Sequence, residues 1–447
     1  MIIEFSVENY KSIGARQTLH MQPARKTQGK HLVLETGFIR EPQVLPCAAI
    51  LGANASGKSS LIDSLKQFVS MVKQTRERSK EDRFTDKRFK LNSGYRNKPT
   101  CFDVSFVAKD GNLYTYSLSY LPEKIVSEEM TRVAPVKNSR VCQLIKRVGD
   151  ERYIHPSIHE DSQILKMWKE DVNDQQTYFT YLSNKGGVTV FDSPMHWFSS
   201  IMFFSDIVPH IITSSLLETK IEKKPWIIEQ LSKADIHLSD ISVTEEKIDI
   251  PEAVLSMIVN DAMKESGDSE EVVRKKLSSD AFKSLNVSVT HKDIAGQDVV
   301  FDFDEESDGT KHYYSLLGPI LEALEDGRLL VSDELDRSLH SHLVWRLIQL
   351  FSLPKNNRKQ AQLIFTTHDV TVMDKSLLRP DQIYLTEKDP ESYETELLCL
   401  SDFEGVNKKD RGFSLDKKYL QGRFGAIPDV DWDWLEETAN GENPHGA

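Results

Sequence analysis

An eight-residue segment near the N-terminus has the residue types and spacing of a phosphate-binding loop. Residues 52–59 read GANASGKS and match G-x-x-x-x-G-K-[ST] at every position. Glycines let such a loop turn successive backbone N–H groups towards phosphate oxygens, in front of a helix N-terminus. The Lys58 ammonium can reach the β- and γ-phosphates, and the Ser59 hydroxyl can bind Mg²⁺. The predicted nucleotide-binding residues are Gly52, Asn54, Ala55, Ser56, Gly57, Lys58, Ser59 and Ser60.

A pair of acidic residues far downstream can supply the rest of the chemistry. Residues 329–332 (LLVS) are mostly apolar and lead directly into Asp333 and Glu334. A strand that ends there would bring Asp333 to a sheet edge, where its carboxylate can hold Mg²⁺ through water. Glu334 could then polarise an attacking water as a general base. Such acidic strand ends are common, and the phosphate-binding loop is what favours catalysis here. We predict Glu334 and Lys58 as catalytic residues, and Ser59 and Asp333 as Mg²⁺ ligands.

The nucleotide is predicted to be ATP. GTPases position water with glutamine and read guanine through N-K-x-D. Residues 407–410 (NKKD) match that tetrad formally, but they follow a polar segment and lie about 350 residues beyond the loop. They are better interpreted as a solvated loop.

Elements recognisable from their periodicity would position these groups. Residues 44–51 form a nearly continuous apolar run, typical of a strand buried on both faces, and residues 61–72 repeat at helical spacing. A helix is expected over Thr310–Leu324, a strand before His368, and a hairpin over Phe102–Tyr120. Residues 288–303 resemble a second hairpin, and residues 210–285 read as mostly helical.

Composition describes an ordinary globular protein. The 447 residues include 56 Lys or Arg and 69 Asp or Glu, for a net charge of −13. No apolar stretch reaches 18 residues and no leader is visible, so we expect no membrane span and no secretion. The four cysteines are scattered without a C-x-x-C pair, which favours a reducing cytoplasm and argues against a cysteine zinc site. The acidic balance argues against a protein that coats nucleic acid through bulk charge.

Five short motifs resemble ABC-type ATPases of the SMC and RecF branch. Asp333–Asp336 and Ser338–His340 resemble their Walker B motif and D-loop. Glu306–Thr310 resembles the signature motif, Thr366–Asp369 the switch-histidine loop, and Glu8–Ser12 (ENYKS) the opening E-N-F-K-S. The resemblance implies an α/β P-loop NTPase fold: an ABC-ATPase-like head with a split core and a large, mostly helical insertion.

The resemblance also implies roles for three further residues. Ser307 and Gly309 would bind the γ-phosphate in trans, across a head-to-tail dimer, and His368 would act in catalysis by sensing that phosphate. Taken alone, Ser307 is equally an ordinary helix N-cap and His368 a satisfied core histidine.

A narrower resemblance rests on ESDGT, DELDRSLH, TTHD, RPDQIYL and the segment Tyr419–Pro428 (YLQGRFGAIP). Together these are similar to ATP-binding proteins of bacterial abortive-infection and restriction-linked loci, including RloA-like proteins and the ATPase subunits of Septu and PARIS. The resemblance implies ATP and Mg²⁺ as cofactors, a homodimer or higher homo-oligomer, and an associated nuclease or toxin effector in anti-phage defence. It covers roughly residues 1–70 and 285–430.

The predicted organisation has four parts. Residues 1–70 form the N-terminal part of the ATPase head, and residues 285–430 its C-terminal part. Residues 71–284 are an insertion with a basic segment, a hairpin and a helical arm or dimerisation region. Residues 431–447 are an acidic tail.

Some signals leave alternatives open. Residues 73–98 carry ten Lys or Arg and four Asp or Glu, with interleaved aromatic residues. They are a nucleic-acid surface, a partner interface or a solvated loop. His155 and His159 have the spacing of a metal pair, but Pro156 argues against the helix that it needs. The alternative functions are a RecF- or SMC-like DNA-binding ATPase in repair or maintenance, a non-hydrolysing scaffold, and a transporter ATPase, the last disfavoured because no membrane partner is implied.

Overall fold

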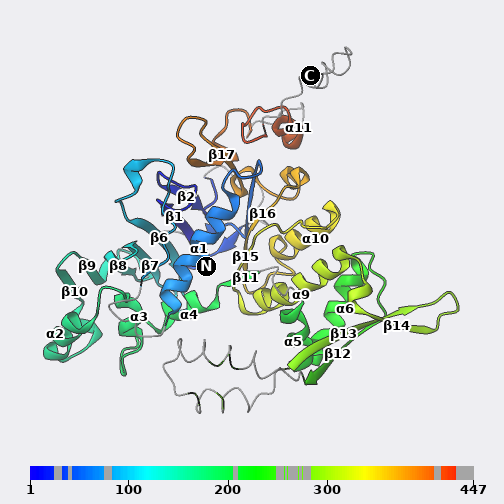
Figure 1. Cartoon of the computed structure of the whole chain (residues 1–447), viewed down its shortest axis with the longest axis horizontal. Coiled ribbons are helices and arrows are strands. Elements are labelled where there is room, and N and C mark those ends of the chain that lie inside the picture. The colour runs from blue at the N-terminus through cyan, green and yellow to red at the C-terminus, as the bar shows by residue number, and fades with distance from the viewer. Residues whose placement is uncertain are drawn as a thin grey trace.

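The computed structural model describes most of the chain (Figure 1). The described residues are 1–24, 33–38, 43–74, 83–204, 210–247, 283–406 and 414–428, with residues 256, 259, 270 and 274. The formal N-K-x-D match at 407–410, part of the basic stretch at 75–82, most of the predicted arm between 248 and 282, and the acidic tail lie outside them.

A six-stranded, mainly parallel sheet carries the predicted nucleotide motifs. Its order is β11-β15-β16-β5-β17-β18, and only β18 runs antiparallel to its neighbour. The strand before the loop, β5, lies between β16 and β17, so the two distant parts of the predicted core adjoin. The bounds are β5 Cys47–Gly52, β11 Met202–Phe204, β15 Leu329–Ser332, β16 Gln362–Thr366, β17 Ile383–Lys388 and β18 Thr395–Cys399.

A seven-stranded antiparallel sheet forms the second large element. Its order is β10-β9-β8-β7-β6-β1-β2. The first strand of the chain therefore pairs with β6, from the predicted insertion. The bounds are β1 Ile2–Glu8, β2 Gln17–His20, β6 Thr100–Val107, β7 Leu113–Leu121, β8 Lys124–Val133, β9 Cys142–Val148 and β10 Glu151–Ile154.

Helices cover the parallel sheet in two layers. Apolar residues of α1 pack in one core with β1, β6 and one face of the parallel sheet, whereas α9 and α10 pack on the other face. Figure 1 shows α1 at the centre of the molecule, beside both sheets. The helices are α1 Lys58–Lys73, α2 Ser162–Asp171, α3 Tyr178–Ser183, α4 Asp192–Ser200, α5 Ile211–Thr219, α6 Lys224–Lys233, α9 Asp308–Asp326, α10 Ser341–Ser352 and α11 Leu415–Leu420. Among the described residues, none of the helices is long and apolar enough to cross a membrane.

Two smaller sheets complete the described structure. A three-stranded antiparallel sheet, in the order β12-β13-β14, includes a hairpin that turns at Gly296 and projects from the body (Figure 1). The bounds are β3 Leu34–Glu35 and β4 Gln43–Val44 for the two-stranded sheet, and β12 Asp240–Lys247, β13 Lys283–Lys292 and β14 Asp298–Asp302 for the three-stranded one.

Most of the predicted elements are confirmed, with two differences. The buried strand, the helix after the loop, the helix over Thr310–Leu324 and both hairpins are present. The helical expectation for 210–285 is wrong at β12, where Ile241 and Val243 alternate with polar residues and pair with β13. Within the predicted insertion, residues 162–200 and 211–233 are largely helical. Residues 100–154 consist mainly of strands, because their alternating pattern extends the sheet that begins with β1.

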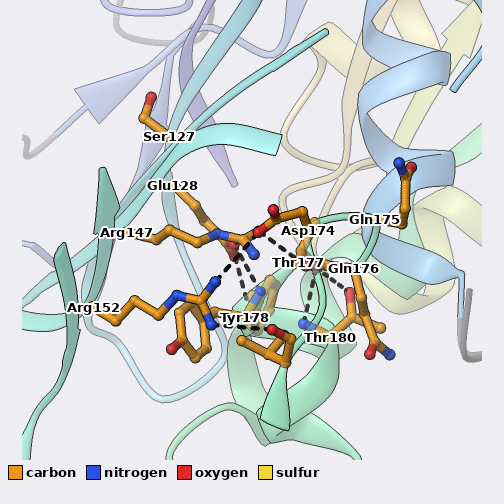
Figure 2. A network of polar contacts seen from close by, with 12 residues as sticks. Ser127, Glu128, Arg147, Arg152, Asp174, Gln175, Gln176, Thr177, Tyr178 and Thr180 are labelled. Atoms are coloured by element: carbon orange, nitrogen blue, oxygen red, sulfur yellow. Dashed lines mark hydrogen bonds and ion pairs between the residues drawn. The ribbon is translucent and has the colours of Figure 1, made fainter. Parts of the chain in front are cut away.

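A buried ion pair fastens the antiparallel sheet to α3. Oε2 of Glu128 in β8 lies 3.2 Å from a terminal guanidinium nitrogen of Arg147 in β9, and each side chain is only 1% exposed. Figure 2 shows both groups pointing at the start of α3, where Glu128 accepts the backbone N–H groups of Tyr178 and Phe179 at 2.7 and 2.9 Å. The Glu128 carboxylate therefore supplies the acceptors that N–H groups in the first turn of a helix lack. From the same helix, the Thr180 hydroxyl donates to the carbonyl oxygen of residue 72 in α1, at 2.7 Å.

Candidate functional site

The loop between β5 and α1 has a backbone that its glycines make possible. Gly52 and Gly57 have φ of +152° and +113°, in the region that favours glycine. A Cβ atom at Gly52 would overlap the carbonyl oxygen of Thr386, and one at Gly57 would overlap the side chain of Thr395. Both glycines are therefore needed, since the loop is pressed against β17 and β18. Ala55 also has a positive φ, of +61°.

Lys58 lies inside the arc of this loop. Its ammonium donates to the carbonyl oxygens of Gly52 and Ala53, at 2.8 and 3.0 Å. Burial lowers the pKa of this amine, and the negative charges of Asp333 and Glu334 act in the opposite direction. The positive charge is thus directed at the space that the loop encloses.

Thr366 organises the two acidic residues at the end of β15. Its hydroxyl donates to Oδ1 of Asp333 at 2.6 Å and accepts the backbone N–H of Glu334 at 2.7 Å. Glu334 has a φ of +52°, which costs a non-glycine residue about 1 kcal/mol or more. This turn sends the Glu334 side chain out to solvent, while Asp333 stays half-buried. One threonine therefore sets the different orientations of neighbouring carboxylates.

His368 follows the end of β16, beside the acidic pair. Its backbone N–H donates to Oδ2 of Asp336 at 3.0 Å, which joins the strand end to the segment after Glu334. The His368 side chain is exposed. It is therefore not a satisfied core histidine, which was the alternative interpretation.

A cavity of about 590 Å³ brings Lys58, Glu334 and His368 together, whereas Asp333 is not among the residues that line it. One wall is the glycine-rich loop with the first residues of α1, and another holds Glu334 and His368. The remaining wall is formed by Lys11, Ser12, Lys388 and residues 86–91. A neighbouring cavity of about 620 Å³ shares the loop and His368 and extends to residues 426–428, the end of the YLQGRFGAIP segment.

The ENYKS motif holds the third wall in place, through contacts that sequence reasoning missed. Asn9 is fully buried, has a φ of +55°, and donates through Nδ2 to the carbonyl oxygens of Tyr95 and Lys98 at 3.0 and 2.9 Å. Its Oδ1 accepts the N–H of Phe89 at 3.0 Å. Because one side chain binds backbone groups nine residues apart, it fixes the segment that faces the loop. The motif was the signal, but its partners lie 80 to 90 residues away.

Asp63 of α1 ties the same wall to the helix after the loop. It accepts from the Tyr10 hydroxyl and the Lys11 ammonium, both at 2.7 Å, and from the Lys87 ammonium at 3.0 Å. Burial raises the pKa of Asp63, but the hydrogen bonds from Lys11, Tyr10 and Lys87 outweigh it, so the pKa lies below its usual value. Sequence reasoning also missed this residue, since an acid inside a helix has no local signal.

Ser307 and Gly309 do not line the cavity that contains Lys58. Ser307 is the N-cap of α9, accepts the Thr310 N–H at 3.1 Å, and remains exposed. A Cβ atom at Gly309 would lie 2.8 Å from the carbonyl oxygen of Ser338, so the signature-like and D-loop-like segments pack directly together. The signature-like segment is therefore exposed and lies outside the cavity that holds the loop.

A family model matches this chain over residues 47–152 and 149–374, which together span most of the described fold. That family is described as "AAA domain, putative AbiEii toxin, Type IV TA system". The chain belongs to this family. The family and the sheet arrangement confirm the predicted α/β P-loop ATPase fold. No curated protein matches the chain.

Solved structures similar to this family member include an SMC head and RecF. The SMC head bound to the C-winged helix domain of ScpA is 15% identical, covers 94% of this chain and 99% of its own, and has a TM-score of 0.38. RecF with ATPrS is 12% identical, covers 89% and 98%, and has a TM-score of 0.35. RecF with ATP is 12% identical, covers 82% and 93%, and has a TM-score of 0.32.

The site offers hard oxygen donors of the kind that Mg²⁺ prefers. The Ser59 hydroxyl lines the cavity, and the Asp333 carboxylate lies beside Glu334 on the facing strand end. Mg²⁺ in nucleotide sites takes few protein ligands and keeps water and phosphate oxygens. Among the described residues there is no group of three His, Cys, Asp or Glu side chains that could hold a metal by itself, and His155 instead bonds Ser157 at 2.8 Å.

Proposed function

We propose that the chain binds ATP at residues 52–60 and hydrolyses it within a head-to-tail homodimer. The observation that carries this proposal is the separation of two incomplete surfaces. The cavity beside the loop is open, with Glu334 and His368 exposed along one side. Ser307 offers a hydroxyl at a helix N-terminus on a different surface. Two chains related by a twofold axis could bring one chain's Ser307 to the other's cavity, at two equivalent sites.

Each residue has a defined task in the proposed hydrolysis. Backbone N–H groups of the loop and the N-terminus of α1 bind phosphate oxygens, and Lys58 neutralises the charge that develops on them. The exposed Glu334 carboxylate orients a water and takes its proton, while Thr366 holds the backbone of that residue. His368 would contact the γ-phosphate, and the partner's Ser307 and Gly309 would complete its enclosure.

Mg²⁺ would be held by Ser59 and Asp333. When bound, it would neutralise charge on the phosphates as they separate. The hydrogen bond from Thr366 fixes one carboxylate oxygen of Asp333 and leaves the other for the ion or for its water ligands.

We further propose that ATP-driven closure controls an associated nuclease or toxin in anti-phage defence. The family description, with its reference to a toxin and a toxin–antitoxin system, supports this role. The abortive-infection motifs quoted above are its second support. Co-expression with the protein encoded beside this chain tests it. We expect that Lys58→Ala changes the toxicity of the pair, and an unchanged toxicity would contradict the role.

ATP turnover and mass in solution test the dimer. We expect slow hydrolysis by the wild type, and an ATP-stabilised dimer for Glu334→Gln, which retains the shape of the side chain but cannot act as a base. Glu160→Gln, at an exposed position before α2, is the matched control and should behave as the wild type. A Glu334→Gln protein that stays monomeric with ATP would refute the head-to-tail mechanism. Stimulation of turnover by duplex DNA would instead favour a DNA-maintenance ATPase.

A further inference from the structure

Two oppositely charged segments lie on the two surfaces that the proposed dimer would join. The basic segment, residues 87–98 (KRFKLNSGYRNK), contains five Lys or Arg and no acidic residue. The acidic segment, residues 302–308 (DFDEESD), contains five Asp or Glu and no basic residue. The two segments thus have equal and opposite formal charge, in a chain whose net charge is negative.

The basic segment borders the cavity that holds Lys58. Its first five residues line that cavity, and Lys90 and Leu91 are exposed there. Lys87 is paired with Asp63 and Arg88 with Asp86, but Lys90 and Arg96 make no ion pair within the described part of the chain. Asn9 holds the backbone of the segment. Through Lys90 and Arg96 the segment therefore presents positive charge without an ion-pair partner beside the predicted nucleotide.

The acidic segment leads directly into the signature-like residues. Asp302 and Glu305 form a reciprocal capping box, which fixes the turn before Ser307. Glu306 pairs with His291 and Asp308 with Lys311, whereas Asp304 and Glu305 are exposed and make no ion pair with any residue that the structure describes. The adjoining strand β14 pairs with β13 on one side and is the sheet edge among the described residues; its five residues are all exposed, with Val300 at 67%. Uncovered apolar area and fixed negative charge thus occur together.

Chain geometry links the two segments. Asp304 is three residues before Ser307, so the two can be at most about 10 Å apart. The cavity that would receive Ser307 has a volume of only about 590 Å³ and is bordered by the basic segment. If one chain's Ser307 reaches the nucleotide of the other, its acidic segment must therefore lie at the rim that carries Lys90.

We infer that the β14 edge and the acidic segment of one chain dock onto the basic segment of a second copy of the same chain. This inference rests on the proposed ATP-bound dimer and specifies what recognises the partner. The charges steer and align the two copies, and the exposed Val300 and Leu91 side chains contribute apolar contact. Because the contact is electrostatic and lies at an exposed rim, it weakens when salt shortens the Debye length from about 10 Å at 0.1 M to about 3 Å at 1 M.

Charge reversal in a Glu334→Gln background tests this docking. We expect Asp304→Lys/Glu305→Lys to raise the dimer dissociation constant with ATP at least about tenfold. The control Glu160→Lys/Glu170→Lys makes the same charge change at exposed positions around α2 and should leave the constant within about twofold. Fluorescent ATP binding to dilute monomer checks that the acidic variant retains its nucleotide site.

A mixing experiment makes the test specific. Lys90→Glu/Arg96→Glu should also fail to dimerise alone. Mixed with the acidic-segment variant, it should form a heterodimer, because one site then joins two native segments and the other joins two reversed ones. The inference would be overturned if the mixture formed no heterodimer. It would also be overturned if the acidic-segment variant alone dimerised with wild-type affinity.

Two further results would separate the possible failures. If the parent Glu334→Gln protein does not dimerise with ATP, the proposed function fails, and the docking inference fails with it. If the parent dimerises but Lys90→Glu/Arg96→Glu loses only duplex DNA binding, the basic segment is a nucleic-acid surface and the inference alone is wrong.

Discussion

Replacing Glu128 with glutamine is expected to lower the free energy of unfolding by more than the loss of a solvent-exposed ion pair would. Four donors converge on this carboxylate: the Tyr116 hydroxyl at 2.9 Å, the backbone N–H groups of Tyr178 and Phe179, and Arg147. Each oxygen accepts two of them. A glutamine amide turns one of these oxygens into a donor, so in either orientation a buried backbone N–H loses its acceptor.

The size of the effect follows from burial. Removing one partner of a fully buried ion pair costs about 3–5 kcal/mol, because the other charge is left uncompensated. An unsatisfied buried N–H costs about 1–3 kcal/mol. This cost is not added in full, because the figure for the broken ion pair already includes part of it. We therefore expect Glu128→Gln to lower the free energy of unfolding by about 3–5 kcal/mol. Glu129→Gln, next in the strand but half-buried and bonded to Gln143, is the control and should cost less than about 1 kcal/mol.

Urea unfolding followed by tryptophan fluorescence measures the change, and amide hydrogen exchange locates it. Exchange should accelerate in α3 and in the last turn of α1, because the Thr180 hydroxyl bonds that turn. The double variant Glu128→Leu/Arg147→Met gives the sharper test. Apolar replacement of a buried pair is often neutral or stabilising, but here it strips the acceptors from Tyr178 and Phe179. We expect a loss of at least about 2 kcal/mol, and wild-type stability of the double variant would refute the anchoring role.

Three further predictions concern the site. Thr366→Val should lower kcat for ATP at least tenfold, because Asp333 and the backbone of the next residue lose their shared partner, and Thr366→Ser should restore most of it; equal rates for both would contradict this. Asp63→Asn should raise KM for ATP several-fold with little change in kcat, since the cavity wall loosens while the acidic pair is untouched; unchanged KM at neutral pH would be the contrary result. Gly57→Val should abolish binding of fluorescent ATP, because a side chain there overlaps Thr395, while circular dichroism should remain that of a folded protein.

The site elements that could be predicted are those whose signal is contiguous. The loop, its flanking strand and helix, and the apolar run before Asp333 each occupy a few consecutive residues, so spacing and periodicity are enough. The parallel strands could be placed in one sheet only because their ends carry related chemistry. The sequence has no local feature that makes β6 pair with β1, because the two strands are about 100 residues apart in the chain. For the same reason, the partners of Asn9 and the carboxylate at Asp63 emerge only from the fold.

Helix α1 is the part of the molecule through which a nucleotide at the loop could affect the remainder. Its first residues are held by neighbours of the loop, where Ser60 bonds Ser12 at 2.9 Å and the Thr395 hydroxyl lies 2.8 Å from the carbonyl oxygen of Ser56. Its last turn is held by Thr180, on the helix that the buried ion pair fastens to the antiparallel sheet. A helix of 16 residues spans about 24 Å. Since both ends are bonded and the helix between them is packed, α1 directly links the nucleotide loop to α3 and, through Glu128, to the antiparallel sheet.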